Sequence, residues 1–304
     1  MLEPQWTYSN SRRLTQWYGH VDYYGQYVIG QWFVLDAKTG TEYWSRTFGR
    51  PNTVCDCAHD VIVAYETRSD GPWTFGFGIY GIDAQTGQLL WTNHGRGLWG
   101  KLLRCADYVR GFTNEFRDVP KCIVNGYVIT ASGRFLDVRN GRENPTLKIP
   151  IPDGNERSRP DQKLNDNKSL EIDGDTIRVQ GPPDDFVILR HDPDGHEIWR
   201  FASRERSLHV DGNFYSYRLH GDHIFIVLGD APNYVPIKES DPLCVKRNPA
   251  NYQMGVLNVS SGECKLYPLA NAQQRTECRI EAIRDDRILV SCDGTQLTEY
   301  RIAT

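Results

Sequence analysis

The sequence predicts an all-β fold, namely a single β-propeller of six four-stranded antiparallel blades that spans residues 1–304. Three observations favour this fold class. A hairpin pattern recurs along the chain, each copy is preceded by a second hairpin, and aromatic residues make up 12% of the sequence. Aromatic rings pack well on pleated strands, and a repeat that runs through the whole chain predicts one domain.

The clearest copies of the hairpin pattern lie near the start of the chain. Residues 33–44 read FVLDAKTGTEYW, and residues 80–91 read YGIDAQTGQLLW. In both, an apolar run leads to Asp-Ala, a polar turn ends in Gly, and Trp follows that Gly by four places, as Gly40 precedes Trp44. The pattern predicts a β-hairpin whose Gly adopts a positive φ.

Looser copies continue downstream, with turns that end at Gly141, Gly195 and Gly262. Trp199 follows the second of these glycines by four places, and Leu266 follows the third at the same distance. Neighbouring copies are separated by roughly 45 to 65 residues. This spacing fits a four-stranded blade with its loops.

Two units depart from this plan. Pro145 stands where the third unit should have its Trp, which predicts a weakened edge strand. The last unit is one strand short, and we expect residues 4–9, which contain Trp6, to pair with residues 296–302 and close the ring. The alternatives are a frayed N-terminus beside an open last blade, and a seventh blade if the segment 95–120 contains further strands.

These hairpins resemble the repeats of quinoprotein-like (PQQ-like) β-propellers, in which a strand ends in Leu-Asp-Ala, x-Thr-Gly follows, and the next strand carries Trp. The segments DAKTG before Trp44 and DAQTG before Trp91 match that signature closely. The resemblance implies an architecture and no particular activity. It also implies that Trp44, Trp91 and Trp199 are structural and pack between neighbouring blades.

The quinone chemistry of that superfamily is not expected here, and no cofactor is expected. Its dehydrogenases use eight blades and a disulfide between adjacent cysteines, whereas Asp56 separates Cys55 from Cys57. The sequence also lacks the short motifs of serine hydrolases, zinc proteases, phosphate loops and dinucleotide sites. The segment DPDG at 192–195 begins like a calcium loop without the required glutamate, so its place in the repeat predicts a hairpin turn.

Composition limits the classes of partner and compartment. The formal net charge is −4 and no run of Lys or Arg could follow a phosphate backbone, which argues against nucleic acid. No apolar run approaches membrane-spanning length, and the first residues do not resemble a signal peptide. We therefore expect a cytoplasmic protein, or a secreted or periplasmic one if a leader has been trimmed, with its eight cysteines as reduced, buried thiols.

Two sets of side chains could carry chemistry on inner strands. Cys55, Cys57 and His59 alternate, so a regular strand would point them the same way and could offer zinc or copper a site. We favour simple packing and expect no metal. His20 and Asp22 could act as an acid–base pair, although a hydrogen-bonded structural pair is the favoured interpretation.

Long insertions suggest a docking face, because aromatic residues and Arg are frequent at interfaces. The loops expected to form this face are 66–76, 95–120 and 229–251. The candidate binding residues are Trp73, Trp99, Tyr108, Arg110, Phe116 and Tyr234. The function predicted is a non-catalytic scaffold that docks a protein or a small ligand on one face.

The alternative function is an enzyme with a site at the channel mouth, as in lactonase-like or synthase-like propellers, possibly with the help of a metal. Its candidate catalytic residues are His20, Asp22, Arg104 and Asp107.

Overall fold

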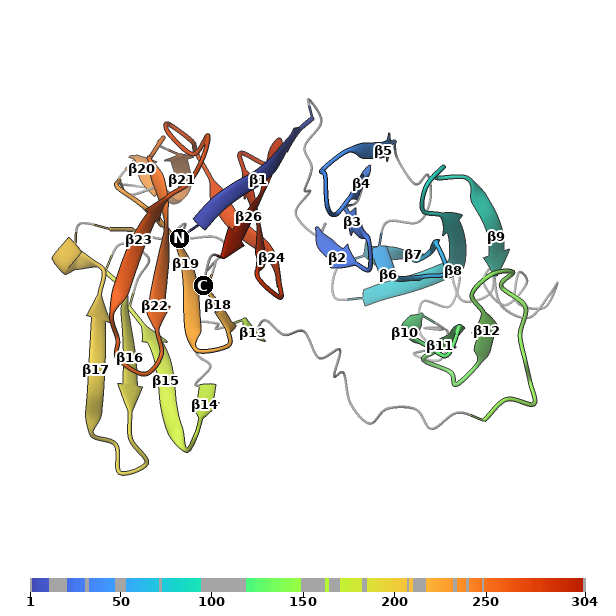
Figure 1. Ribbon diagram of the computed structural model, residues 1–304, viewed down its shortest axis with the longest axis horizontal. Helices are drawn as coiled ribbons and strands as arrows, with labels where there is room; N and C mark the ends of the chain where they lie inside the picture. Colours follow the sequence, from blue (N-terminus) through green and yellow to red (C-terminus); the bar gives the residue numbers. More distant parts are fainter. Residues whose placement is uncertain are drawn as a thin grey trace. The chain divides into compact units, whose positions relative to one another are not determined.

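The computed structural model describes residues 2–10, 21–30, 33–46, 53–70, 73–93, 119–148, 162–163, 170–181, 185–206, 208–209, 217–231, 234–238, 241–247 and 249–302. These residues form antiparallel strands and a single short 3-10 helix, η2, at Arg204–Arg206. The chain divides into two compact units (Figure 1): one unit combines Met1–Arg13 with Ser158–Thr304, and the other is Leu14–Arg157. The prediction of an all-β chain is confirmed, and the prediction of one domain over 1–304 stays a prediction.

The described residues of the unit Leu14–Arg157 form three sheets, each with its strands in chain order. The first sheet consists of β2 (Asp22–Tyr24), β3 (Tyr27–Ile29), β4 (Phe33–Asp36) and β5 (Glu42–Ser45). The second consists of β6 (Thr53–Ala58), β7 (Val61–Asp70), β8 (Trp73–Asp83) and β9 (Leu89–Asn93). The third consists of β10 (Pro120–Val124), β11 (Tyr127–Thr130) and β12 (Phe135–Asp137).

The third sheet is the one in which Pro145 predicts a weak edge. Among the residues described there, the expected fourth strand is reduced to one isolated bridge between Leu136 and Glu143. Proline cannot donate a hydrogen bond to a neighbouring strand, which explains why pairing stops two residues before it.

Where the structure describes the other unit, its strands form three sheets and a separate hairpin. One sheet consists of β14 (Leu170–Ile172), β15 (Asp175–Gln180), β16 (Val187–His191) and β17 (Glu197–Ala202). The next consists of β13 (Gln162–Lys163), β18 (Tyr217–His220), β19 (His223–Gly229), β22 (Tyr252–Asn258) and β23 (Cys264–Pro268). The last consists of β24 (Cys278–Arg284), β25 (Arg287–Cys292), β26 (Gln296–Ile302) and β1 (Leu2–Ser9).

The pairing of β1 with β26 joins segments from opposite ends of the sequence (Figure 1). Leu2 lies opposite Ile302, Ser9 lies opposite Gln296, and the hydroxyl oxygens of Thr7 and Thr298 are 3.1 Å apart. The expectation that the N-terminal segment supplies the missing strand of the last sheet is confirmed.

Two predicted loops contain regular structure instead. The segment 66–76 belongs to a long hairpin, because β7 and β8 stay paired up to Asp70 and Trp73. The segment 229–251 contains the extra hairpin of β20 (Tyr234–Lys238) and β21 (Asp241–Arg247). Pro236 and Pro242 lie within these two strands, because prolines are tolerated in the edge strands of an isolated hairpin.

Each hydrophobic core lies between two neighbouring sheets of one unit. Ile188 and Phe201 pack with Tyr217 and Ile224 across one such interface. Met254 and Tyr300 belong to the next core along the chain. All of these residues except Phe201, at 2%, are 1% exposed or less, so the unit depends on contact between sheets.

The repeated Asp-x-x-Thr-Gly segment forms the same turn wherever it occurs. The Oδ1 atom of Asp36 accepts hydrogen bonds from the backbone N–H of Lys38 (2.9 Å) and of Thr39 (2.8 Å). Gly40 closes the turn at a φ of +69° and donates to the Asp36 carbonyl at 2.9 Å. Burial alone would raise the pKa of Asp36, but the bonds from Thr39 and Lys38 lower it. Asp83 and Asn258 accept equivalent bonds, which explains why the pattern tolerates Asn.

The tryptophans of the repeat bind to the turn of the neighbouring sheet. The Nε1 atom of Trp44 donates to the Ala84 carbonyl at 2.9 Å, and that of Trp91 donates to the Val138 carbonyl at 2.7 Å. Trp199 repeats this contact with the Val259 carbonyl, also at 2.7 Å. In each case the acceptor directly follows the Asp or Asn of the turn. The three tryptophans are each 8% exposed, so the structural role implied by the resemblance is confirmed.

A β-bulge precedes each of these tryptophans. Trp44 lies opposite Val34 and Glu42 lies opposite Leu35, which leaves Tyr43 as the extra residue. Leu90 and Ile198 occupy the same place beside their own tryptophans. These extra residues are 39%, 47% and 47% exposed. The bulge turns the bulky indole inward and leaves an apolar neighbour at the surface.

A turn glycine can be required for two reasons, its positive φ and the lack of space for a Cβ beside a neighbouring indole. A matched pair of variants separates these two reasons. Gly141 has a φ of +66°, and a Cβ there would overlap the indole of Trp91. Gly133 has a φ of +79° with no atom within 4 Å of such a Cβ. We expect Gly133→Ala to cost about 1–2 kcal/mol from backbone strain and Gly141→Ala about 3 kcal/mol or more, measured by urea unfolding. Equal costs would contradict the proposed contact.

Candidate functional site

Most of the residues that the sequence singles out lie outside the part of the chain that the structure describes. These residues are His20, Trp99, Arg104, Asp107, Tyr108, Arg110 and Phe116. For Trp73, at the start of β8, and Tyr234, at the start of β20, the structure describes the backbone. Their roles in binding or catalysis stay predictions.

Asp22 is the one predicted catalytic residue that the structure describes. It begins β2, lies opposite Ile29, and is half-buried. Its Oδ1 atom accepts a hydrogen bond from the backbone N–H of Tyr23 at 2.8 Å. This local bond holds the carboxylate against its own strand, and the acid–base pairing with His20 stays a prediction.

The expectation that Cys55 and Cys57 point the same way is wrong. A β-bulge between Val54 and Asp56 shifts the register of β6 against β7. Cys55 consequently packs into the core that contains Trp91, while Cys57 packs against the core that contains Trp44. Burial raises the pKa of the Cys57 thiol to about 12, with help from Asp56 and Asp60, so it is a poor source of the thiolate that zinc requires.

His59 does not join these cysteines either. It occupies a turn with a φ of 52°, and a Cβ at Gly126 would lie 3.2 Å from its Nε2 atom. The imidazole thus extends toward the β10–β11 hairpin. Packing, the favoured interpretation of this set, agrees with these positions.

A different set of possible ligands gathers in the β16–β17 turn. Among the described residues, only Asp192, Asp194 and His196 bring three such atoms within 4.8 Å of one another. Asp192 accepts bonds from the backbone N–H of His196 (2.8 Å), and its Oδ2 atom lies 3.1 Å from the imidazole Nδ1. These bonds are those of a tight hairpin turn, as the repeat predicted for DPDG.

A cavity of about 470 Å³ lies in the unit that contains both chain ends, where the β18–β19 and β24–β25 turns approach each other. The Nε2 atom of His220 donates to the Asp285 carbonyl at 2.7 Å and ties the two turns together. The apolar lining consists of Leu2, Phe225, Val256, Tyr267 and Ile302. The polar lining comes from the turns and consists of His220, Asp222, His223, Asp285 and Asp286.

Among the described residues, the two sheets beside the cavity share no tryptophan contact of the kind made by Trp199. Strand β23 pairs with β22 without a bulge, so Lys265 lies opposite Val256. In the preceding sheet, Trp199 occupies the corresponding position opposite Arg190. Leu266 points outward and is 37% exposed. The expected equivalence of Leu266 with the tryptophans is therefore wrong, because sequence spacing did not reveal the missing bulge.

The carboxylates around the cavity differ in whether an arginine pairs with them. A hydrogen bond from Arg301 (2.7 Å) lowers the pKa of Asp286. Asp285 lies 3.7 Å from the nearest nitrogen of Arg284, and both side chains are exposed. Within the described residues, no cation pairs with the exposed carboxylate of Asp222. Sequence analysis missed this site, although the segments HGDH and RDDR mark the inner hairpin turns of two successive units.

A disulfide joins β24 and β25, which are neighbouring strands of the last sheet. Cys278 on β24 lies directly opposite Cys292 on β25, with their Cα atoms 4.2 Å apart. Both residues are buried. The expectation of reduced thiols is wrong for this pair. The two cysteines are 14 positions apart in the sequence, and the register of the β24–β25 hairpin places them opposite each other.

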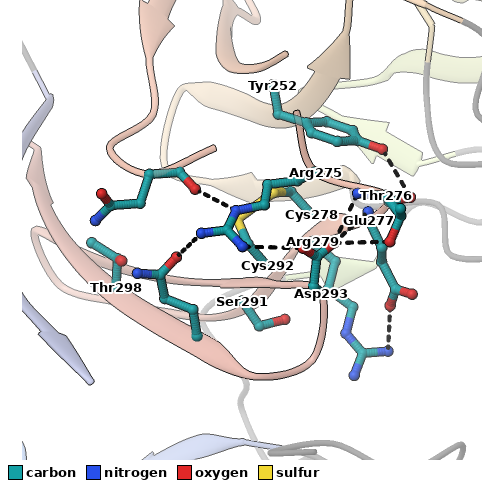
Figure 2. The surroundings of a disulfide bond; sticks show 12 residues. Tyr252, Arg275, Thr276, Glu277, Cys278, Arg279, Ser291, Cys292, Asp293 and Thr298 are labelled. Carbon is teal, nitrogen blue, oxygen red and sulfur yellow. Dashed lines mark hydrogen bonds and ion pairs between the residues drawn. A yellow bond between two sulfur atoms is a disulfide. The ribbon is translucent and has the colours of Figure 1, made fainter. Parts of the chain in front are cut away.

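Figure 2 shows that a polar network surrounds this disulfide. The Oδ1 atom of Asp293 accepts bonds from the backbone N–H groups of Thr276 (2.8 Å) and Glu277 (3.2 Å). Arg275 reaches Asp293 at 3.2 Å, and Arg279 reaches Glu281 at 2.6 Å. The network fixes the segment that leads into β24, so the disulfide and Asp293 hold the same corner of the sheet.

Reduction should therefore weaken this unit. We expect dithiothreitol to lower the free energy of unfolding by about 2–4 kcal/mol, because it releases a short closed loop in the unfolded chain. Urea unfolding with and without the reductant measures the effect. The double variant Cys278→Ala with Cys292→Ala serves as the control, since its stability should not respond to dithiothreitol. An equal response in both proteins would contradict the assignment.

Within the described residues, no helix has the length and apolar character needed to cross a membrane. No family model matches the chain, and no curated protein matches it. Similar solved structures include ADHIIG, a quinohemoprotein alcohol dehydrogenase from Pseudomonas putida HK5, at 12% identity and a TM-score of 0.24. That match covers 95% of this chain and 40% of the dehydrogenase, so the chain spans two fifths of its length.

A second similar structure is the CNH domain of AfRom2, at 8% identity and a TM-score of 0.36, with 100% of this chain and 99% of that domain covered. Likenesses of this degree carry no argument about activity. The chain itself is all-β, and its antiparallel sheets, mostly of four strands, are consistent with a propeller.

Proposed function

We propose that this chain is a non-catalytic binding module and that a small ligand occupies the cavity between the β18–β19 and β24–β25 turns. The observation that carries the proposal is the composition of that cavity. Five apolar residues line it together with a few polar groups from two turns. Ligand sites usually combine an apolar surface with a small number of polar groups that orient the ligand.

The size and support of the cavity favour the same conclusion. A volume of about 470 Å³ falls in the range of small-molecule sites. Phe225, which is 1% exposed, anchors the apolar side in a core between sheets. The bond from His220 to the Asp285 carbonyl holds the polar side, so both sides are positioned before any ligand arrives.

Filling the cavity tests this function. We expect 2-phenylethanol to bind with a Kd of about 1 mM, equivalent to a binding free energy of about −4 kcal/mol, as measured by ligand-observed NMR. Val256→Trp should abolish this binding because the larger side chain occupies the cavity. Leu89→Trp, an exposed position on β9, should leave it unchanged. Absence of binding to the wild-type protein, or equal binding to Val256→Trp, would refute the proposal.

We further infer that the sheets form one six-bladed ring. Support comes from Trp6, because Trp6 lies opposite Glu299 and Pro4 lies opposite Tyr300, the same bulged register that surrounds Trp44. Its Nε1 atom is buried without a hydrogen-bond partner among the described residues. In the other tryptophans of this pattern, the indole N–H donates to the carbonyl that follows the Asp or Asn of a turn in the next sheet.

Replacing Trp6 by Phe tests ring closure, because the two alternatives predict changes of opposite sign in the free energy of unfolding. If the indole N–H has an acceptor, Trp6→Phe should destabilise the protein by about 1–3 kcal/mol, as Trp44→Phe should. If the N–H stays unpaired in a buried site, its removal should be neutral or stabilising. Urea unfolding of both variants, with Trp44→Phe as the reference, distinguishes these outcomes.

A further inference from the structure

The charged groups that line the cavity all have the same sign. Asp222, Asp285 and Asp286 contribute carboxylates, while no Lys or Arg belongs to the lining. Arg301 engages Asp286 through a bond of 2.7 Å, Arg287 lies 4.0 Å from the same carboxylate, and Arg284 lies 3.7 Å from Asp285. The carboxylate of Asp222 is paired with no cation among the described residues, and its side chain is exposed. The site therefore presents negative charge that the protein itself balances only in part.

The apolar side of the same cavity adds a second requirement. Phe225 and Tyr267 contribute aromatic rings, and Leu2, Val256 and Ile302 contribute aliphatic surface. An aromatic face attracts a nearby cation and also packs well against another ring. A ligand that satisfies both sides needs an apolar body and a positive end.

We propose that the cavity selects an organic ammonium, namely a protonated amine on a short aromatic or branched aliphatic body. The apolar body lies against Phe225, Val256 and Tyr267, and the ammonium faces Asp222 and Asp285. This selectivity rests on the proposed binding function and specifies its ligand class. A carboxylate of the same shape is disfavoured, because it would bring a like charge to the aspartates.

Three probes of matched shape test the charge preference. At neutral pH, 2-phenylethylamine is a cation, 2-phenylethanol is neutral and phenylacetate is an anion. We expect the amine to bind roughly two- to fivefold more tightly than the alcohol, the range given by an exposed charge pair, and phenylacetate to bind most weakly. The preference for the amine should shrink between 50 mM and 500 mM salt because exposed charges are screened.

Two variants locate the source of the preference. Asp222→Asn should weaken binding of the amine more than binding of the alcohol, which brings the two Kd values together. Asp194→Asn, in the exposed β16–β17 turn, should alter none of the three affinities. Equal binding of amine and alcohol, or tightest binding of phenylacetate, overturns the ammonium proposal while the binding function stands. Failure of all three probes overturns both.

Discussion

The structure depends on one repeated interaction, the hydrogen bond from a tryptophan indole to the first carbonyl after an Asp or Asn turn in the neighbouring sheet. The turn positions that carbonyl, because the Asp36-type side chain binds two backbone N–H groups and a glycine with positive φ completes the loop. The bulge positions the indole, because Tyr43 and its equivalents absorb the extra residue. These hydrogen bonds therefore fix how one sheet packs on the next. Contact between apolar surfaces alone would not specify a single packing arrangement.

These local features are also what the sequence could predict. Turn chemistry and strand alternation act over a few residues, so the hairpins, the role of Trp44, Trp91 and Trp199, and the strand that contains Trp6 were all accessible to sequence reasoning. Features set by register across a sheet were not. The bulge at Cys55 separated a predicted metal set, and the facing positions of Cys278 and Cys292 emerged only from the pairing of β24 with β25.

The cavity illustrates the same limit at the level of packing between sheets. Its interface has Lys265 where another sheet has a tryptophan, and a bond from His220 to the Asp285 carbonyl connects the inner turns instead. Without a large ring at that position, Val256 and Tyr267 face open space. The candidate site thus results from an interruption of the repeat. Sequence reasoning sought function in long aromatic insertions and had no local signal for a missing side chain.

The pairing of β1 with β26 has a consequence for biosynthesis. Thr7 and Thr298, which face each other across these strands, are 291 positions apart in the sequence. At about 5–20 residues per second, a ribosome needs roughly 15–60 s to make the intervening polypeptide. During that interval β1 is an unpaired strand edge, open to chaperones and to foreign strands. If the other sheets form as they are synthesised, β1 is the last strand to pair.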